Sequence, residues 1–291
     1  MPQLDYPALA ALSAVLRTGS FDAAAAQLGV TPSAVSQRIR ALEERMGAVL
    51  VLRGAPCTPT ETGDRLQRHA ETVGLLERTL GEDLAALAPA PLRLAVNADS
   101  LATWFPAALA GAEGFVYDLV IDDQAHSHDW LRRGAVAAAV TAQPGPVQGC
   151  NSHPLGALRY IATCSPAFHA RWFAGGVTAD TLAAAPVMAF DAKDRLQHDW
   201  VRQAIGAEVP LRPHMAPSTH AFVDLALAGL AWGMNPEPLV AGHIAEGRLV
   251  PLIPDLPHDT PLYWQVSRHV AAALEPLTRS VRRAAKARLV G

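Results

Sequence analysis

The sequence has little of what marks secreted or membrane-spanning proteins. Its 291 residues include only three cysteines, Cys57, Cys150 and Cys164, which lie far apart and cannot all pair with one another. We therefore expect no disulfide framework and place the protein in a reducing cytoplasm. The longest apolar run, residues 221–234, contains Asp224 and is shorter than the ~20 residues of a transmembrane helix. No N-terminal segment has the pattern of a secretory signal.

Motifs of common enzyme classes and a large charge of one sign are also missing. The sequence contains no G-x-S-x-G, no P-loop and no dinucleotide-binding G-x-G-x-x-G, so we expect neither an enzymatic activity nor a cofactor. With 24 Lys and Arg against 27 Asp and Glu, the net charge is −3. Any binding to nucleic acid must therefore depend on a local patch. Half of the residues are hydrophobic, which is typical of a folded chain of two or three domains.

The first 88 residues are expected to be helical and to contain a helix-turn-helix. Ser20 and Gly29 are start and stop signals for a short helix, and Thr31 with Pro32 is a strong start signal for the next one. Two short helices joined by a glycine turn indicate a helix-turn-helix. The expected elements are helices over residues 6–17, 21–28 and 32–46, and a small β-wing over residues 49–53 and 57–59.

The third of these helices has an apolar face and an opposite face suited to the major groove of DNA. Apolar residues recur from Val35 to Met46 at steps of four, three and four, which places them on one side of a helix. Hydroxyl, amide and guanidinium groups on the other side can read base edges, whereas Arg38 and Arg53 are better placed for phosphates. An ordinary solvated face is the alternative. The predicted DNA-binding residues are Thr31, Ser33, Ser36, Gln37, Arg38, Arg40 and Arg53.

A seven-residue apolar repeat follows within a long helix predicted over residues 60–87. The repeat consists of Leu66, Val73, Leu80 and Leu87, with Leu76 and Leu84 between its members. Such a seam indicates an interface between two helices, so we expect a homo-oligomer. A helix buried within one chain is the alternative.

After Pro89 and Pro91 the sequence alternates strands and helices. Strands are expected over residues 92–96, 116–122, 136–141, 158–163, 187–190, 211–215, 231–234 and 262–267, and helices over 100–111, 128–134, 194–203, 222–229 and 271–289. The initial βαβαβ run predicts an α/β fold with a parallel sheet covered by helices. In such sheets, ligands bind beyond the carboxyl ends of the strands.

The segments beyond these strands supply candidate ligand-binding residues. Free N–H groups at the helix starts near Ser100 and Thr219 would bind a carboxylate. Asp99, Asp123 or Asp191 would bind amino groups through charge-assisted hydrogen bonds. Capping of its own helix is the alternative for Asp99 and Ser100. The predicted effector-binding residues are Asn97, Asp99, Ser100, Asp123, Thr141, Asp191, Ser218 and Thr219.

Three further patterns have simpler interpretations. His126 and His128 lie near several aspartates, but two residues at i and i+2 of a helix do not share a face, so we expect no metal site. Cys57 and Cys164 are expected to be small hydrophobic residues rather than redox sensors. The basic run over residues 279–288 is expected to be a solvated helix face rather than a nucleic-acid-binding tail.

Several segments together resemble LysR-type transcriptional regulators. The part specific to that superfamily is the helix-turn-helix segment SFDAAAAQLGVTPSAVSQRIRALEERMG, followed by VLVLR and TPTETG. The segment NADSLATW is similar to one branch, the amino-acid-exporter regulators of the ArgP and LysG type, which respond to lysine and arginine. The similarity continues through LRRGAVAAAVT, HPLGALRY and PLYWQ, and so covers essentially the whole chain.

The resemblance implies a winged helix-turn-helix followed by a two-lobed effector domain like periplasmic binding proteins. The implied parts are a DNA-binding domain over residues 1–59, a dimerisation helix over 60–88 and an effector domain over 89–291, with lobe I at 89–160 and 267–291 and lobe II at 161–266. The implied function is a regulator that binds promoter operator DNA as a homodimer or homotetramer. Its implied effector is lysine or arginine, and its implied target is an amino-acid exporter gene.

One departure from the branch and one alternative function remain beside the implied role. The chain departs from the branch at His220, where its members tend to carry an acidic residue, and a neutral imidazole does not supply that charge. From another functional class, the alternative is a solute-binding or catalytic α/β protein whose helical arm serves only assembly.

Overall fold

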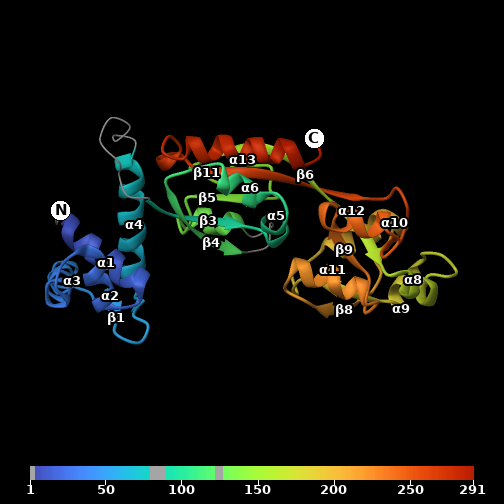
Figure 1. Ribbon diagram of the computed structural model, residues 1–291, viewed down its shortest axis with the longest axis horizontal. Coiled ribbons are helices and arrows are strands. Elements are labelled where there is room, and N and C mark those ends of the chain that lie inside the picture. The colour runs from blue at the N-terminus through green and yellow to red at the C-terminus, as the bar shows by residue number, and fades with distance from the viewer. Residues whose placement is uncertain (1–3, 79–89, 122–126) are drawn as a thin grey trace. The chain divides into compact units, whose positions relative to one another are not determined.

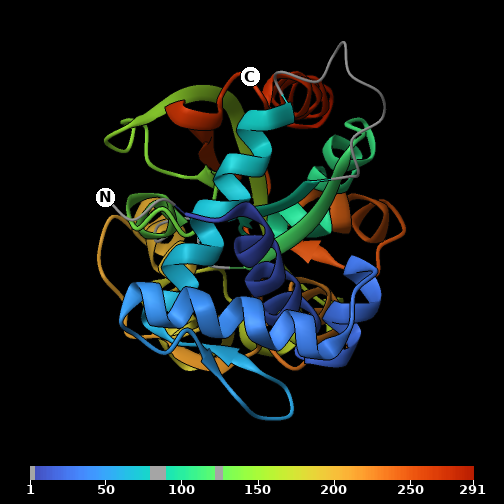
Figure 2. The ribbon, with the colours of Figure 1, turned by 90° about the vertical axis from the view of Figure 1, so that its left-hand side faces the viewer.

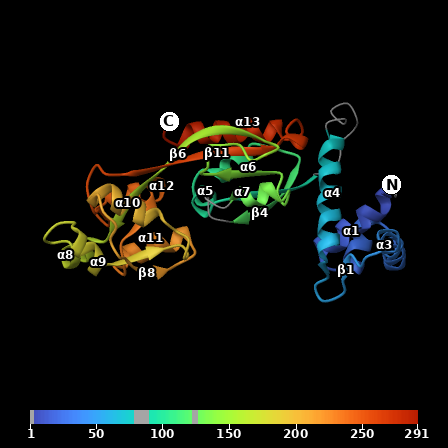
Figure 3. The same ribbon diagram turned by 180° about the vertical axis from the view of Figure 1, so that it is seen from behind.

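The computed structural model describes residues 4–78, 90–121 and 127–291 (Figures 1 and 3). The chain divides into two compact units, Met1–Leu92 with Gly114–Tyr117, and Arg93–Glu113 with Asp118–Gly291. We call them the N-terminal unit and the C-terminal unit and describe each by itself.

The N-terminal unit contains the predicted helix-turn-helix and wing. Its elements are α1 (Tyr6–Thr18), α2 (Phe21–Leu28), α3 (Pro32–Met46), β1 (Val51–Leu52), β2 (Thr58–Pro59) and α4 (Glu61–Arg78). The start signals act as expected, because the Ser20 hydroxyl accepts from Ala23 N–H at 3.4 Å and the Thr31 hydroxyl accepts from Ala34 N–H at 3.2 Å. Strands β1 and β2 pair antiparallel and confirm the wing. The predicted continuation of α4 beyond residue 78 lies outside the described residues.

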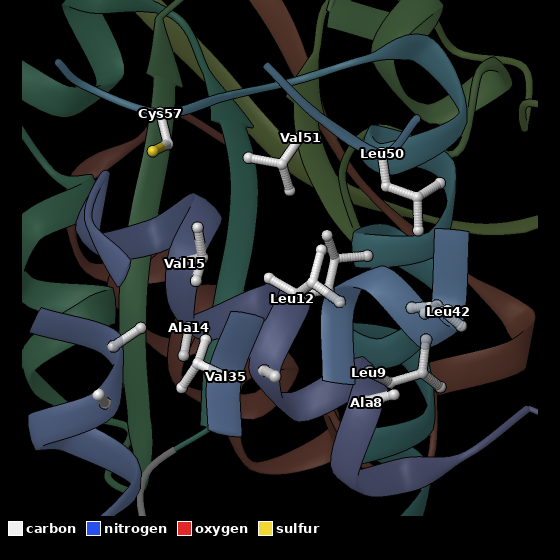
Figure 4. Packing of buried hydrophobic residues seen from close by; sticks show 14 residues of the cluster. Ala8, Leu9, Leu12, Ala14, Val15, Val35, Leu42, Leu50, Val51 and Cys57 are labelled. Atoms are coloured by element: carbon white, nitrogen blue, oxygen red, sulfur yellow. The ribbon is translucent and has the colours of Figure 1, made fainter. Parts of the chain in front are cut away.

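One hydrophobic core holds these elements together (Figure 4). Leu12 of α1 and Val35, Ile39 and Leu42 of α3 are almost completely buried in it, and Leu50 joins them just before β1. The expected apolar face of α3 is therefore confirmed. Burial of several such side chains, each worth ~1.5–3 kcal/mol, fixes the orientation of α3 and with it the direction of its polar face.

The start of α4 is fixed to the wing at short range. A β-carbon at Gly63 would collide with the carbonyl group of Leu50, so only glycine allows this approach. The Thr60 hydroxyl donates to the Val49 carbonyl at 2.8 Å and accepts from Gly63 N–H at 3.1 Å. The side chain of Glu43 at the end of α3 accepts from Leu50 N–H at 2.8 Å. The wing therefore connects α3 to α4 by hydrogen bonds as well as by packing.

The apolar repeat on α4 is only partly turned away from its own chain. Leu66 is half-buried and packs against the core of the N-terminal unit, as the alternative of burial within one chain expects for this member of the repeat. Leu75, which is not part of the repeat, is buried. Val73 is half-buried, and Leu76 is 42% exposed. Leu80, Leu84 and Leu87 lie outside the described residues.

A mixed sheet forms the centre of the C-terminal unit, although the first three residues of β3 and of β4 belong to the N-terminal unit. Its strands are β3 (Ala90–Val96), β4 (Phe115–Ile121), β5 (Ala138–Thr141), β6 (Cys150–Cys164), β9 (Gly233–Pro236), β10 (Val250–Pro251) and β11 (His258–Ser267). The order is β10-β6-β11-β5-β3-β4, with β9 also paired to β6. Strands β3 and β5 are parallel, as expected, but β11 is antiparallel to both β5 and β6. The parallel pairing expected for the initial βαβαβ run is therefore confirmed by β3 and β5. The later strands add antiparallel pairs, because the chain leaves on β6 and returns on β11.

Strands β6 and β11 run together from one lobe to the other (Figures 1 and 3). They pair from His258 opposite Tyr160 to Ser267 opposite Cys150, with one register shift. Near that shift, Gly156 has a φ of +105°, a conformation that favours glycine. The strand expected over residues 158–163 is therefore longer in the structure, because pairing with β11 extends it through Pro154 and Gly156, which interrupt the local strand pattern.

Short helices cover the sheet in the first lobe. They are α5 (Ala98–Ala102), α6 (Phe105–Ala110), α7 (Ser127–Arg132) and α13 (Glu275–Arg288). The single helix expected over residues 100–111 was wrong, because Pro106 has no N–H to donate to the Ala102 carbonyl, and the chain restarts as α6. Helix α13 buries Leu277 and Val281 and exposes its Arg and Lys side chains, as expected of a solvated basic face.

The second lobe contains five helices among the described residues and a small parallel sheet. The helices are α8 (Pro166–Trp172), α9 (Ala179–Ala184), α10 (Leu196–Ile205), α11 (Thr219–Leu227) and α12 (Glu237–Ala245), and the sheet pairs β7 (Pro186–Ala189) with β8 (Arg212–Met215). The strand expected over residues 231–234 was shifted by two. Trp232 N–H donates to the Pro186 carbonyl of β7, so the pairing with β6 begins at Gly233 and extends through Asn235 to Pro236.

Candidate functional site

Helix α3 lies at the surface of the N-terminal unit (Figure 2), and the residues of its polar face are exposed or half-buried. Ser33, Gln37 and Arg40 are exposed, and Ser36 and Arg38 are half-buried. The helix therefore presents the side chains that its periodicity predicted. Arg and Gln can each make two hydrogen bonds to one base in the major groove, and Ser can bond to a base or to a phosphate.

Three predicted DNA-binding residues also have partners in their own chain. Thr31 caps α3, as described above. The Arg40 Nε atom lies 3.4 Å from a carboxylate oxygen of Glu44, and these side chains are 80% and 70% exposed. The guanidinium carbon of Arg53 lies 4.9 Å from the centre of the Phe21 ring. An exposed ion pair contributes at most ~1 kcal/mol, so Arg40 can exchange Glu44 for a base.

The C-terminal unit contains a cavity of about 290 Å³. Residues from the start of α5, from the segment between β7 and α10, from α11 and from β11 line it. The predicted effector-binding residues in this lining are Asn97, Asp99, Asp191 and Thr219. Those outside it are Ser100, Thr141 and Ser218. Asp123 lies outside the described residues.

Asp99 connects the two lobes across the cavity. One of its carboxylate oxygens accepts from the buried Tyr160 hydroxyl at 2.7 Å, and the other accepts from the Thr219 hydroxyl at 2.6 Å. Asp99 belongs to α5 in the first lobe and Thr219 to α11 in the second. The N-cap residue of α5 is Asn97. The alternative interpretation, that Asp99 caps this helix, is therefore wrong. Hydrogen bonds to an ionised carboxylate are stronger than neutral ones, and here they join both lobes.

The predicted residues outside the lining have other tasks in the fold. The Thr141 hydroxyl accepts from the Gln265 amide at 3.0 Å, within a buried network that anchors the segment after β5. Ser218 caps α11, since its hydroxyl accepts from Ala221 N–H at 3.3 Å. Ser100 is completely buried. Position after a strand or at a helix start thus predicted the neighbourhood correctly but not which side chains face the cavity.

Two aspartates beyond β7 shape the cavity wall by binding backbone N–H groups. One oxygen of Asp191 accepts from Lys193 N–H at 2.7 Å and from Asp194 N–H at 3.1 Å. The oxygens of Asp194 accept from Phe190 N–H at 2.9 Å and from Leu196 N–H at 3.0 Å. The second of these bonds explains why α10 begins at Leu196 rather than at the expected Asp194, which now lies before the helix.

Strand β11 brings an ion pair and a histidine to the cavity. Asp259 and Arg159 form two hydrogen bonds of 2.8 Å each, and this bonding lowers the pKa of the Asp259 carboxyl. His258 Nδ1 lies 3.1 Å from the Gln203 side-chain oxygen. Burial lowers the pKa of His258, and the negative charges of Asp199 and Asp259 oppose that shift. His258 and Asp259 both line the cavity.

Sequence reasoning missed several lining residues, among them Gln197, His258 and Thr260. The local pattern predicts the start of β11 only at Leu262, whereas the strand begins at His258, so residues 258–261 lie outside the predicted strand. For Gln197 a signal was present, because it shares the buried face of α10 with Trp200 and Val201. A polar side chain on an otherwise apolar helix face indicates either a buried partner or a ligand.

The minor alternatives find no support in the described part of the chain. No group of three or more His, Cys, Asp or Glu residues that could hold a metal occurs among the described residues, and His126 lies outside them. Cys57, Cys150 and Cys164 are buried and unpaired. Burial raises the pKa of Cys164 to about 12 and also raises that of Cys150, so neither forms a reactive thiolate at neutral pH.

Within the described ranges, every helix is too short or too polar to span a bilayer.

Two family models match this chain. A model described as bacterial regulatory helix-turn-helix protein, lysR family, matches residues 7–64, and one described as LysR substrate binding domain matches residues 85–286. Together they cover the helix-turn-helix, the wing and both lobes.

Relatives of known name match along nearly their whole length. The HTH-type transcriptional regulator LysG of Mycobacterium tuberculosis is 45% identical over 287 residues, which is 98% of this chain and 94% of that protein. The HTH-type transcriptional regulator ArgP of Pseudomonas aeruginosa is 43% identical over 281 residues, 94% of this chain and 93% of the relative.

Solved structures agree with these sequences. A crystal structure of ArgP from Mycobacterium tuberculosis has a TM-score of 0.78 and 45% identity, and the match covers 99% of this chain and 100% of that one. Full-length LysG from Corynebacterium glutamicum with bound effector Arg has a TM-score of 0.66 and 36% identity, with 99% and 100% coverage. These matches include the helix-turn-helix, the wing and the two-lobed unit described above. The chain therefore belongs to the LysR family of bacterial transcriptional regulators.

Proposed function

We propose that this protein is a cytoplasmic, homo-oligomeric regulator that binds promoter operator DNA and responds to lysine or arginine. Its target, on this proposal, is an amino-acid exporter gene. The observation that carries the proposal is the cavity lined by Asp99 and Asp191, in a chain that matches, over 99% of its length, a LysG structure with bound arginine. Carboxylates beside a cavity are suited to the cationic groups of such a ligand.

The proposal assigns DNA binding to the N-terminal part and effector binding to the rest. We keep the division into residues 1–59, 60–88 and 89–291, with the lobes bounded at 160 and 267. DNA contacts come from the predicted face of α3 with Thr31 and Arg53. Effector contacts come from Asn97, Asp99, Asp191 and Thr219 of the lining, together with Asp123. An arm used only for assembly would have no need of an exposed face of Ser, Gln and Arg on α3.

A mobility-shift titration tests the regulatory function. The full-length protein is titrated against the DNA upstream of its own gene, with and without 1 mM arginine or lysine, and a scrambled sequence serves as control. We expect preference for the upstream DNA and a change in that affinity with a basic amino acid. Equal affinity for the scrambled DNA would contradict a role as a sequence-specific regulator.

Calorimetry on Asp123→Asn tests the choice of a basic effector. The substitution keeps the shape of the side chain and removes its charge, so lysine should lose more affinity than norleucine, which lacks the terminal ammonium group. Equal losses for both ligands would remove Asp123 from this role. Failure of the wild-type protein to bind either basic amino acid would leave DNA binding standing and reject the proposed effector.

A further inference from the structure

The carboxylates around the cavity are already largely used within the protein. Both oxygens of Asp99 accept from hydroxyl groups, both oxygens of Asp194 accept from backbone N–H groups, and both oxygens of Asp259 accept from one guanidinium group. A ligand that relied on these three side chains alone would have to displace existing bonds.

Two neutral polar side chains in the lining are in the opposite situation. Gln197 is 2% exposed, and among the described residues neither its side-chain oxygen nor its side-chain nitrogen has a hydrogen-bond partner. Thr260 is 8% exposed, and its hydroxyl likewise has no partner within the described part of the chain. Both line the same cavity. Buried polar groups are nearly always hydrogen-bonded in native proteins, and leaving them without a partner is costly.

The chemistry of the amide restricts what can satisfy it. A primary amide carries an acceptor oxygen and a donor NH₂ group on the same carbon atom. An ammonium or guanidinium group only donates, and a carboxylate only accepts, so each alone leaves half of Gln197 unsatisfied. The α-ammonium and α-carboxylate of an amino acid, attached to one carbon, offer a donor and an acceptor side by side.

Charged side chains of both signs surround this end of the cavity. Lys193 and Arg195 lie four and two residues before Gln197 and line the cavity, and so do Asp191, Asp194 and Asp199 of the same segment. An amino acid carries both signs on one carbon, so its α-carboxylate can face the cationic side chains while its α-ammonium group faces the carboxylates.

We infer that Gln197 and Thr260 form the subsite for the α-amino-acid end of the effector, an inference that rests on the proposed function. The Gln197 nitrogen donates to the α-carboxylate, and its oxygen accepts from the α-ammonium group. The Thr260 hydroxyl accepts a further hydrogen bond from that ammonium. The subsite recognises what all α-amino acids share, so it sets ligand class, while the choice among side chains is made elsewhere in the cavity.

A comparison of arginine with agmatine, which lacks only the α-carboxylate, tests this assignment. Calorimetry on the full-length protein should show Gln197→Ala weakening agmatine by about tenfold, because the hydrogen bond to its ammonium group is lost. The same substitution should weaken arginine by a further factor of about ten, because the hydrogen bond to the α-carboxylate is lost as well. Thr260→Val should weaken both ligands by similar factors, because both carry the amino group. Gln148→Ala is the control: it removes an exposed amide outside the lining and should leave the ratio of the two affinities unchanged.

A measurement without ligand adds an independent check. Gln197→Leu replaces a buried amide that has no partner by an apolar group of similar size, so the melting temperature of the unliganded protein should stay the same or rise while arginine binding is lost. A marked fall in melting temperature would show that the amide is structurally bound and would overturn the inference. Equal losses of arginine and agmatine in Gln197→Ala would also overturn it.

Failure of the proposed effector is distinguishable from failure of the subsite. If the wild-type protein binds a neutral amino acid instead of a basic one, the choice of lysine or arginine is wrong. The same comparison with that amino acid and its decarboxylated amine then tests the subsite. A wild-type protein that binds the amine as tightly as the amino acid, or binds no α-amino acid at all, overturns the inference.

Discussion

At the scale of single residues, the Arg159–Asp259 pair ties β6 to β11 at the edge of the cavity. The two side chains are 34% and 38% exposed, so solvent screening limits the contribution of the pair to about 0.5–1 kcal/mol. Because the pKa of Asp259 is lowered in the folded state, this stabilisation is complete above the unfolded carboxyl's pKa of ~3.9 and is lost as the pH falls through the lower folded value.

Asp259→Asn should therefore lower the free energy of unfolding at neutral pH and lose its effect in acid. We expect a loss of about 0.5–1 kcal/mol at neutral pH, measured by urea denaturation of both proteins. In a series of buffers of decreasing pH, the difference between them should shrink once the pH falls below ~4. A difference that stays constant through the series would mean that the charge of Asp259 does not stabilise the fold.

The exposed face of α3 makes a second residue-scale prediction. Arg40→Ala and Gln37→Ala should each reduce the preference for operator over random DNA by ~1–3 kcal/mol per lost base contact. Competition binding with both DNAs measures this preference. Arg45→Ala is the control, since Arg45 is exposed near the end of the same helix and pairs with Asp5 at 3.9 Å. An unchanged preference in Arg40→Ala would show that this face does not read bases.

Arg53 should behave differently from Arg40. A phosphate contact carries no base information, so Arg53→Ala should weaken binding to operator and random DNA alike. It should also reduce the slope of log K against log salt concentration by about one. Loss of operator binding alone, with the salt dependence unchanged, would instead place Arg53 at a base.

The residues of the effector cavity were only partly predictable from sequence. Asn97, Asp99, Asp191 and Thr219 could be found because the ends of strands and the starts of helices can be located from local patterns. Which way a side chain faces depends on its burial against other elements. Ser100, for example, was predicted to bind the effector but is buried outside the cavity lining. Gln197 and Thr260 lie within a helix and a strand, where no loop signal marks them.

At the scale of elements, local signals predicted the N-terminal unit well and the two-lobed sheet less well. The bounds of α2 and α3 follow from Ser20, Thr31, Pro32 and the glycines that end each helix, since caps act within one turn. The first half of β6 and the division between α5 and α6 depend on pairing and packing with distant segments. Such tertiary effects outweigh local propensity.

Helix α4 carries a prediction at the scale of elements. Val73→Asp combined with Leu76→Asp should give a species of smaller mass in analytical ultracentrifugation, because unpaired charges are strongly unfavourable in a helix–helix interface. Leu75→Ala is the matched control: Leu75 is 3% exposed in its own chain, so its truncation should lower the free energy of unfolding by ~2–5 kcal/mol without changing the mass. An unchanged mass of the double variant would move the oligomer contact away from this part of α4.

At the scale of the whole molecule, the helix-turn-helix model matches residues 7–64 and the substrate-binding-domain model matches residues 85–286. On the proposed function, DNA and effector therefore bind to different parts of one chain, and any coupling between them is a property of the full-length protein. Within the C-terminal unit, β6 and β11 connect the lobes, and the Asp99–Thr219 hydrogen bond crosses the cavity between them. Rotation of one lobe against the other about two connecting strands is a hinge motion. A ligand changes DNA binding only to the extent that it favours one arrangement over another.

Thermodynamic linkage then makes a prediction that requires no knowledge of the arrangements themselves. If arginine changes the affinity for operator DNA by some factor, operator DNA must change the affinity for arginine by the same factor, on the order of 5–150-fold for typical coupling free energies. Fluorescence anisotropy of labelled operator with and without arginine gives the first factor, and calorimetry of arginine with and without saturating operator gives the second. Unequal factors would show that a third equilibrium, such as the association of dimers into tetramers, is coupled to both ligands. Repeating both titrations at several protein concentrations would reveal such an association, because it depends on the protein concentration.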